Sequence, residues 1–298
     1  MNISINNADR LVLGTAQLGM YYGIANSSGK PDQSVATAII SEALAHGICQ
    51  FDTAQGYGDS EDVLGRALAD QRRKERIRIV SKLPPVLGNP SRESLRESIE
   101  QSILKLGVNR LSGLMLHRED QLELWDHGLG HMMSSLVKDG LVEQIGVSVY
   151  SPEKALQALE KDDIHIIQVP SNILDARFEN SGVFYCATRL GKTVYVRSIF
   201  LQGLLLMEQL PQHMHFASGY HNAVRSLARE FGITVCELAL WYAREAYPQA
   251  KIVFGVDTPS QIQINVQYWA KERPSLDVSS IRNKIGNVPE RVLNPSLW

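Results

Sequence analysis

Short apolar runs alternate with amphipathic stretches along this chain, and this alternation restricts its fold more than any other feature. The apolar runs are continuous, as in parallel strands that are covered by helices. They are expected to form strands at 11–17, 49–54, 76–83, 111–117, 143–150, 165–172, 193–200 and 251–257. Eight strand–helix units in 298 residues predict an α/β fold, a (β/α)8 TIM barrel that forms a single domain over residues 1–298.

Helical periodicity and end signals place helices between these runs. They are expected at 34–47, 60–70, 91–107, 151–161, 178–190, 220–231, 235–246 and 259–270, with a helical stretch through Val137. Ser60 and Ser151 are the expected N-caps of their helices. The expected buried faces comprise Val35, Ile39, Ala43 and Leu44 in one helix, and Leu95, Ile99, Ile103 and Leu106, before Gly107, in another. A polar helix near 277–285 is expected as a C-terminal addition to the barrel.

Composition and motifs exclude several classes of protein. With a formal net charge of −2, the chain lacks the basic face expected of a partner of nucleic acid or of a membrane surface. The short basic run at 72–76 contains an acid and is interpreted as a solvated helix end. Cys49, Cys186 and Cys236 have no paired spacing, which excludes a disulfide framework and a CxxC site. "GYGDSE" lacks the third glycine of a Rossmann motif and follows the second strand, so that fold is rejected.

Targeting signals are not evident in the sequence. The N-terminal residues are polar and lack the apolar segment of a signal peptide, and no apolar run approaches the length of a membrane span. A cytoplasmic location is the default expectation, and the oligomeric state is left open.

Polar residues gather where the expected strands end. Barrel enzymes carry their chemistry at the C-terminal ends of the strands. The residues at these ends are Asp52, Lys82, His117, Ser148, Gln168, Asn172, Arg197, Ser198 and Gly255, with Tyr57 in the loop after the second strand. Such groups are costly to bury unless they pair and form hydrogen bonds. The mouth of the barrel is therefore the expected site.

Four of these residues together suggest proton transfer, namely Asp52, Tyr57, Lys82 and His117. Each has a structural explanation alone, as a cap, a packed aromatic, a snorkelling lysine or a core histidine. When the four are taken together, the Lys82 ammonium is expected to lower the pKa of Tyr57 from about 10, and Asp52 is expected to hold that ammonium charged. His117 is expected to donate to a substrate oxygen. The result is a proton donor poised at an oxygen where negative charge develops, without a metal.

The sequence resembles the aldo/keto reductase family over nearly its full length. "LGTAQLG", "FDTAQGYGDSEDVLG", "IVSK", "LMLH", "GVS", "QVPSN", "RSIFLQGLL" and "GVDTPSQIQIN" match the strand ends of that family in order. The resemblance implies an oxidoreductase that transfers hydride between a nicotinamide cofactor and a carbonyl or alcohol substrate, an aldehyde, ketone or sugar. It implies that Tyr57 is the general acid/base.

The resemblance also implies a cofactor site. Its residues are Gly14, Thr15, Ser148, Gln168, Asn172, Arg197, Ser198, Phe200, Gln202, Gly203, Leu204, Gly255, Gln261 and Asn265. Ser148, Gln168 and Asn172 would bind the carboxamide, and the start of the helix after the eighth strand would receive phosphate. Residues 200–204 would follow the pyrophosphate.

Three positions depart from the pattern of the family. Ser148 is followed by Val149, where the family often has asparagine. Arg197 stands where a tyrosine usually stacks on the nicotinamide, and its charge would favour the reduced cofactor over the cationic oxidised form. Asp257 lies where the family often has a cation for the 2′-phosphate, and it could accept from free ribose hydroxyls. The resemblance favours NADP(H), and NAD(H) is the alternative.

Substrate contacts are expected from the first loop of the barrel. Tyr21 and Tyr22 lie in it, directly above the mouth, and further candidates are Trp125, His127, Phe216 and Tyr220. The loop 201–219 could close over the cofactor. Its histidines, at 213 and 215 with His221, are interpreted as polar loop residues rather than metal ligands.

Two other functions remain open. The first is a cofactor-binding regulatory subunit with little turnover, a role that the same fold serves. The second is an isomerase or aldolase with Lys82 as Schiff-base nucleophile. This function is disfavoured because Asp52 is expected to hold Lys82 charged, and a charged lysine is unreactive.

Overall fold

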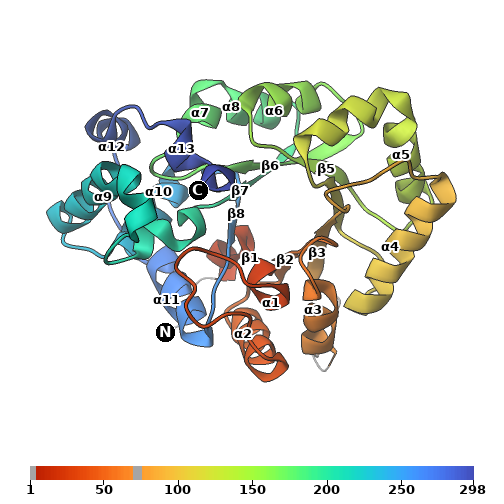
Figure 1. The fold of residues 1–298 in the computed structure, drawn as a ribbon, viewed down its shortest axis with the longest axis horizontal. Coiled ribbons are helices and arrows are strands. Elements are labelled where there is room, and N and C mark those ends of the chain that lie inside the picture. Colours follow the sequence, from red (N-terminus) through yellow and green to blue (C-terminus); the bar gives the residue numbers. More distant parts are fainter. Residues whose placement is uncertain (1–4, 70–75) are drawn as a thin grey trace.

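All eight expected strands form, and each pairs in parallel with its neighbours along the chain until β8 pairs with β1 (Figure 1). The computed structural model describes residues 5–69 and 76–298. The strands are β1 (Leu11–Gly14), β2 (Gln50–Asp52), β3 (Arg78–Lys82), β4 (Gly113–Leu116), β5 (Ile145–Ser148), β6 (Ile164–Pro170), β7 (Thr193–Arg197) and β8 (Lys251–Phe254). The predicted closed (β/α)8 barrel is therefore confirmed.

The strands are shorter than the apolar runs that predict them. β7 ends at Arg197, although its run continues to Phe200. The next residue, Ser198, has a φ of 62°, which no strand can accommodate. Residues at the ends of the runs thus leave the sheet and are free to line the mouth of the barrel.

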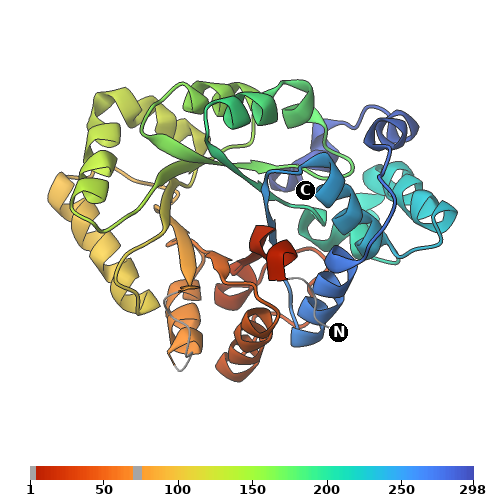
Figure 2. The same cartoon turned by 180° about the vertical axis from the view of Figure 1, so that it is seen from behind.

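Helices form an outer ring around the strands, as both ribbon views show (Figures 1 and 2). The ring consists of α2 (Gln33–Ala45), α3 (Ser60–Leu68), α4 (Arg92–Leu106), α5 (Gly130–Lys138), α6 (Pro152–Leu159), α8 (Val183–Arg189), α9 (Ser218–Glu230), α10 (Val235–Ala246) and α11 (Pro259–Ala270). Shorter or additional helices are α1 (Ala16–Gly19), α7 (Arg177–Asn180), α12 (Val278–Ile285) and α13 (Glu290–Leu293). Turns of 3-10 or π type are η1 (Ile5–Arg10), η3 (Glu119–Leu124), η4 (Trp125–Leu129), η5 (Leu201–Leu206), η6 (Gln212–Ala217) and η7 (Pro295–Leu297).

Several expected helix features hold and others do not. Ser151 accepts from the Lys154 amide as N-cap, and Gly107 ends α4 with a φ of 64°. The expected helix at 178–190 is instead two helices, because Gly182 separates them in a left-handed conformation with a φ of 80°. Ser60 is the first residue inside α3 rather than its N-cap, which is Asp59.

The expected buried face of α2 is partly wrong. Ile39 and Ala43 are buried, but Val35 is exposed, and Ala36 and Ile40 complete the buried face. The short basic run at 72–76 lies, except for its last residue, outside the described residues.

The interior of the barrel determines which residues reach its mouth. A small apolar cluster fills this interior and comprises Val12, Val80, Met115, Ile166, Tyr195 and Val253. Because side chains alternate along a strand, residues two positions further along also point inward. The next layer therefore comprises Gly14, Lys82, His117, Gln168, Arg197 and Gly255. The apolar layer is a floor, and polar groups stand above it.

Candidate active site

Lys82 and Asp52 form a buried ion pair at the centre of this polar layer. The Lys82 Nζ atom donates to both carboxylate oxygens of Asp52 at 2.7 Å and to the Thr53 carbonyl at 3.0 Å. Gln168 Nε2 donates to Asp52 Oδ1 at 2.8 Å. Burial lowers the pKa of Lys82, and the adjacent carboxylate counters this shift. A buried pair is tolerated when additional hydrogen bonds satisfy its remaining polar atoms, as they do here.

The Tyr57 ring packs against this pair through its face. Lys82 Nζ lies 5.1 Å from the ring centroid, and the Tyr57 hydroxyl makes no hydrogen bond to any described residue. Burial and the Asp52 carboxylate raise the pKa of Tyr57 above its usual range. The expected lowering is therefore wrong for the protein alone, because the ammonium is neutralised by Asp52 and faces the ring rather than the phenol oxygen.

His117 lies edge-on to Tyr57, with the ring centroids 5.4 Å apart. Its Nδ1 atom lies 3.2 Å from the Leu83 carbonyl, which can only accept, so Nδ1 carries the proton. Burial and the charge of Lys82 lower the pKa of His117 to about 4, and the ring is neutral near pH 7. Nε2 is then an acceptor, contrary to the expectation that His117 donates.

Close backbone packing seats the loop that carries Tyr57, which sequence reasoning missed. A Cβ atom on Gly19 would lie 1.9 Å from the Tyr57 carbonyl oxygen, so only glycine fits there. Gly58 has a φ of 58°, a conformation that favours glycine and lets the backbone turn sharply after Tyr57. The buried Ser60 hydroxyl donates to the Thr15 carbonyl at 2.8 Å, which joins the start of α3 to the residue after β1.

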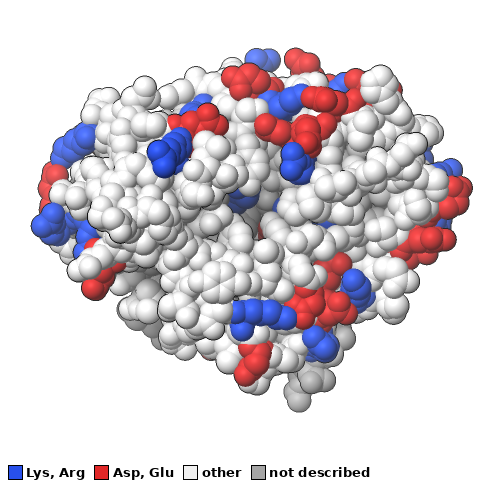
Figure 3. All heavy atoms as spheres, in the orientation of Figure 1, with Lys and Arg blue, Asp and Glu red and all other residues white. Residues whose placement is uncertain are grey.

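A cavity of about 610 Å³ extends from this cluster across the mouth of the barrel. The face seen in Figure 3 is hollowed near its middle, and most charged side chains lie around its rim. Of the expected cofactor residues, the cavity is lined by Gly14, Thr15, Arg197, Ser198, Phe200, Gln202, Gly203, Gly255, Gln261 and Asn265. Asp52 and Tyr57 line it as well. Most of the expected cofactor residues thus share one space with two of the four proton-transfer residues.

Four expected cofactor residues lie outside the lining. Ser148, at the end of β5, and Gln168, in β6, are buried, and Gln168 Oε1 has no partner among the described residues. Asn172 is occupied, because its amide donates to the Ser198 carbonyl at 3.2 Å and accepts from the Leu174 amide at 2.9 Å. Leu204 packs in the apolar core.

A strained turn forms one wall of the cavity. Ser198, Leu201 and Gln202 have φ values of 62°, 51° and 53°, in a region that residues other than glycine rarely adopt. Strain of this kind concentrates at binding sites, where the surrounding structure holds it. Spacing in the sequence gives no sign of it.

The loop after α1, residues 20–32, joins both sides of the cavity. The Ile24 amide donates to the Gln202 carbonyl at 3.1 Å, and Asn26 Nδ2 lies 3.4 Å from Asp257 Oδ1. Of the two expected tyrosines, Tyr22 lines the cavity, whereas Tyr21 is 64% exposed and donates to the Asn26 carbonyl. We refer to residues 20–32 as the first loop.

The other expected aromatic contacts are used elsewhere. Trp125 is buried in the core, and Tyr220 donates to the Asn287 carbonyl. Phe216 packs under the Arg291 guanidinium, 4.2 Å from its ring centroid. His127 is exposed in η4 and does not line the cavity. In place of these residues, Tyr150 lies beside the mouth with the Arg197 guanidinium 4.2 Å from its ring centroid.

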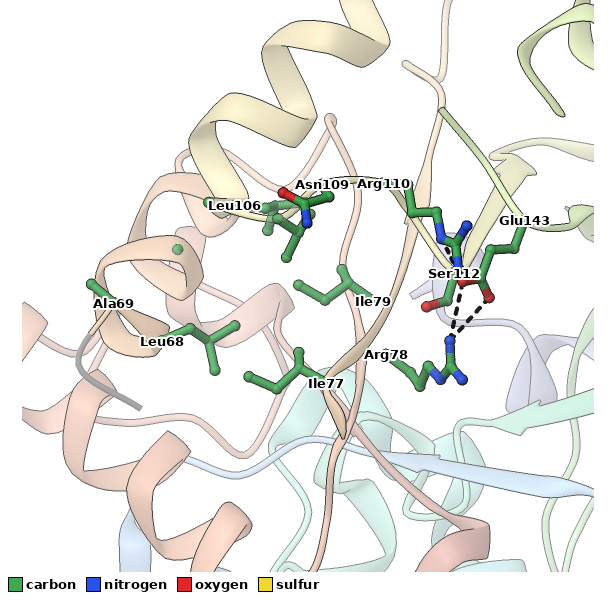
Figure 4. Close-up of a pocket in the computed structure, with 13 residues that line it drawn as sticks. Leu68, Ala69, Ile77, Arg78, Ile79, Leu106, Asn109, Arg110, Ser112 and Glu143 are labelled. Carbon is green, nitrogen blue, oxygen red and sulfur yellow. Dashed lines mark hydrogen bonds and ion pairs between the residues drawn. The ribbon is translucent and has the colours of Figure 1, made fainter. Parts of the chain in front are cut away.

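A second cavity, of about 440 Å³, opens at the opposite ends of the strands (Figure 4). Leu68, Ile77 and Leu106 form its apolar wall. Arg78 and Arg110 both pair with Glu143, at 3.1 and 2.8 Å, and these groups are partly exposed. This cluster joins the starts of neighbouring strands and lies away from the proton-transfer residues.

Within residues 5–69 and 76–298, no group of three or more His, Cys, Asp or Glu side chains could hold a metal ion. His221 Nε2 lies 2.9 Å from the Met207 carbonyl, which fixes it within the protein. No helix in the described part of the chain is both long and apolar enough to cross a membrane.

Comparison with known proteins agrees with this geometry. The sequence model described as "Aldo/keto reductase family" matches residues 10–285. Aldo-keto reductase YhdN of Bacillus subtilis is 23% identical over 86% of this chain and 83% of its own length. The NADH-specific methylglyoxal reductase of Escherichia coli is 28% identical over 86% of this chain and 88% of its own. The holo form of aldo-keto reductase AKR11C1 from Bacillus halodurans is 24% identical, with a TM-score of 0.72 over 97% of this chain and 93% of that one, and shares the fold.

Proposed function

The chain belongs to the aldo/keto reductase family, a family of nicotinamide-dependent oxidoreductases, and we propose that it reduces a small carbonyl substrate with Tyr57 as the proton donor. One observation carries this proposal. Tyr57, Lys82, Asp52 and His117 meet beside a cavity that is large enough for an extended cofactor. An acid next to a space that can hold a hydride donor is what carbonyl reduction requires.

The chain offers suitable partners for a nicotinamide cofactor. Gln168 Oε1 is a buried acceptor to which no described residue donates, which suits the amide hydrogens of a carboxamide. Ser148 pairs with Gln168 in the sheet, and the backbone turn at Ser198 to Gly203 would follow the pyrophosphate. When bound, the nicotinamide exchanges a hydride with the carbon of the substrate carbonyl or alcohol.

The residues of the chain supply the proton and orient the substrate. A raised pKa keeps Tyr57 protonated near pH 7, so its hydroxyl can donate to the carbonyl oxygen as negative charge develops there. Burial and Asp52 disfavour the phenolate that remains, whereas the charge of Arg197 favours it. Asp52 holds Lys82 against the face of the Tyr57 ring. Neutral His117 accepts from a hydroxyl of the substrate or product and fixes its orientation.

Polar and aromatic groups surround the position for the substrate. Tyr22 and Arg197 line the same cavity as Tyr57, and the Arg197 guanidinium packs on Tyr150, 4.2 Å from its ring centroid. Hydroxyl groups and a guanidinium suit a hydroxylated aldehyde, a ketone or a sugar rather than a purely apolar carbonyl. The L-glyceraldehyde 3-phosphate reductase of Escherichia coli, 24% identical, carries such a substrate in its name.

The test is oxidation of NADPH and NADH with a panel of aldoses, small aldehydes and ketones, using Tyr57→Phe as the matched variant. The variant is expected to bind cofactor normally and to lose about 10²- to 10⁴-fold in kcat. A fully active Tyr57→Phe would overturn the assigned role. Tight cofactor binding without turnover on any substrate would instead favour a cofactor-binding regulatory subunit.

Lys82 is unsuited to Schiff-base chemistry. Its amine is fully buried and donates to three oxygens, so no lone pair is available to attack a carbonyl. Borohydride treatment with a carbonyl substrate is therefore expected to leave Lys82 unmodified.

A further inference from the structure

Charge is distributed unevenly along the cavity of the proposed site. The charged residues among its lining are Asp52, Arg197, Glu208 and Asp257. The single cation of this described lining, Arg197, lies at the end that holds Tyr57, where it packs on Tyr150. The other end, formed by Cys236, Asp257, Gln261 and Asn265, contains a carboxylate and no cation.

Asp257 is built into the wall without a cationic partner. The described chain provides one side-chain contact to its carboxylate, the Asn26 amide at 3.4 Å. Its backbone amide donates to Gln261 Oε1 at 2.7 Å, which fixes the residue at the start of α11. Burial raises the pKa of Asp257 above its usual range. Its free lone pairs therefore require donors.

The proposed reaction determines which part of a dinucleotide reaches Asp257. The nicotinamide must lie beside Tyr57, since the proton and the hydride go to neighbouring atoms. An extended dinucleotide would then run past the turn at Ser198 to Gly203, and its adenosine ribose would lie at the far end of the cavity. A carboxylate there accepts from a free 2′-hydroxyl, whereas a 2′-phosphate is normally matched by an arginine.

We propose that the protein selects NAD(H) over NADP(H), and that Asp257 determines this choice by accepting from the free ribose hydroxyls and repelling a 2′-phosphate. This inference rests on the proposed function, and it replaces the NADP(H) that family resemblance favours. Asn26 orients the carboxylate from the first loop.

The N-terminus of α11 does not compensate for the missing cation. A helix N-terminus carries roughly half a positive charge and offers free amides. Here Pro259 lacks an N–H. The Asp257 amide already donates to Gln261 Oε1, and the Gln261 amide already donates to the Thr258 carbonyl. The full charge of Asp257 outweighs what remains of the dipole.

The test measures binding rather than turnover. The protein is titrated with NADH and with NADPH, and quenching of its fluorescence reports binding. Adenosine 5′-monophosphate is compared with adenosine 2′,5′-bisphosphate as a competitor of the dinucleotide. NADH is expected to bind about 10- to 100-fold more tightly than NADPH, and the ratio is expected to fall as salt screens the repulsion. Asp257→Asn is expected to reduce the preference for NADH at least about fivefold, mainly because NADPH binds more tightly to the variant. Asp162→Asn removes the same charge at an exposed site before β6 and is expected to leave the ratio unchanged.

The outcomes separate this inference from the function on which it rests. NADPH binding equal to or tighter than NADH, or an unchanged ratio in Asp257→Asn, would overturn the role of Asp257 and leave the reductase intact. Binding of neither dinucleotide would overturn the proposed reductase and with it the choice between cofactors.

Discussion

Lys82 presents its ammonium to the face of the Tyr57 ring, 5.1 Å from the centroid, while its hydrogen bonds go to Asp52 and Thr53. A cation over an aromatic face is attracted to the ring itself. The phenol oxygen is thus left free for a substrate, and burial together with the negative charge of Asp52 raises the pKa of Tyr57 and keeps the phenol protonated. The ion pair therefore holds Tyr57 ready as an acid rather than as a phenolate.

Asp52→Asn is expected to destabilise the protein strongly, because it leaves the Lys82 ammonium buried without a counter-charge. Breaking a buried ion pair from one side costs about 3–5 kcal/mol. The free energy of unfolding in urea measures this loss. The double variant Asp52→Asn/Lys82→Met removes both charges and is expected to recover part of the stability without recovering turnover. A single variant as stable as the wild type would contradict a charged Lys82.

Gly19→Ala is expected to displace the Tyr57 loop. The added Cβ would lie 1.9 Å from the Tyr57 carbonyl oxygen and 2.4 Å from the Ser60 amide nitrogen, and neither backbone atom can move alone. Overpacking of this kind costs about 1–3 kcal/mol or more. Thermal unfolding should show the loss, and kcat should fall with it. Gly219→Ala in α9 is the control, since no atom lies within 4 Å of its Cβ. If both variants behave alike, the close approach is not what seats Tyr57.

The positions of the proton-transfer residues could be predicted because they follow from strand periodicity. Lys82 and Gln168 each lie two residues past an inward-facing apolar residue, Val80 or Ile166, so the sequence alone places them at the mouth. His117 follows the inward-facing Met115 by the same two positions, whereas Asp52 is predicted from its place at the end of the second apolar run.

Contacts between distant segments could not be predicted from the same pattern. The approach of Gly19 to Tyr57 joins two loops whose backbones meet only in the folded barrel. The pKa of Tyr57 depends on burial and on whether the ammonium faces the ring or the oxygen, and periodicity fixes neither. Asn172 and Leu204 match motif positions, but their side chains are occupied in the fold.

His117 is expected to make stability depend on pH. Its pKa is about 4 in the folded protein and about 6.5 when unfolded, so the unfolded chain binds the extra proton between these values. The contribution of neutral His117 to the free energy of unfolding is complete above pH 6.5 and is lost as the pH falls towards 4. It amounts to about 1–3 kcal/mol. Urea unfolding of His117→Asn at pH 7 and pH 4.5 should show a smaller difference than the wild type.

A matched control for this measurement is His165→Asn. His165 is exposed at the start of β6, where its Nδ1 lies 2.9 Å from the Asp163 carbonyl. Its replacement should leave the pH dependence of stability as in the wild type. A steep dependence that persists in His117→Asn would assign the effect to another group.

Arg197 is expected to favour the reduced over the oxidised cofactor. Its guanidinium has no carboxylate partner in the described chain and makes only long hydrogen bonds, 3.4 Å to Ser198 Oγ and to the Val149 carbonyl. An oxidised nicotinamide ring is cationic, so it would be repelled by the guanidinium beside it, whereas the neutral reduced ring would not. Dissociation constants for NADH and NAD⁺ are expected to differ by about tenfold or more in favour of NADH. Arg197→Met keeps an apolar surface without the charge and should bring the two values together, whereas Arg118→Met, at an exposed site, should not. Equal affinities in the wild type would show that Arg197 is directed away from the ring, towards Tyr150 and the substrate.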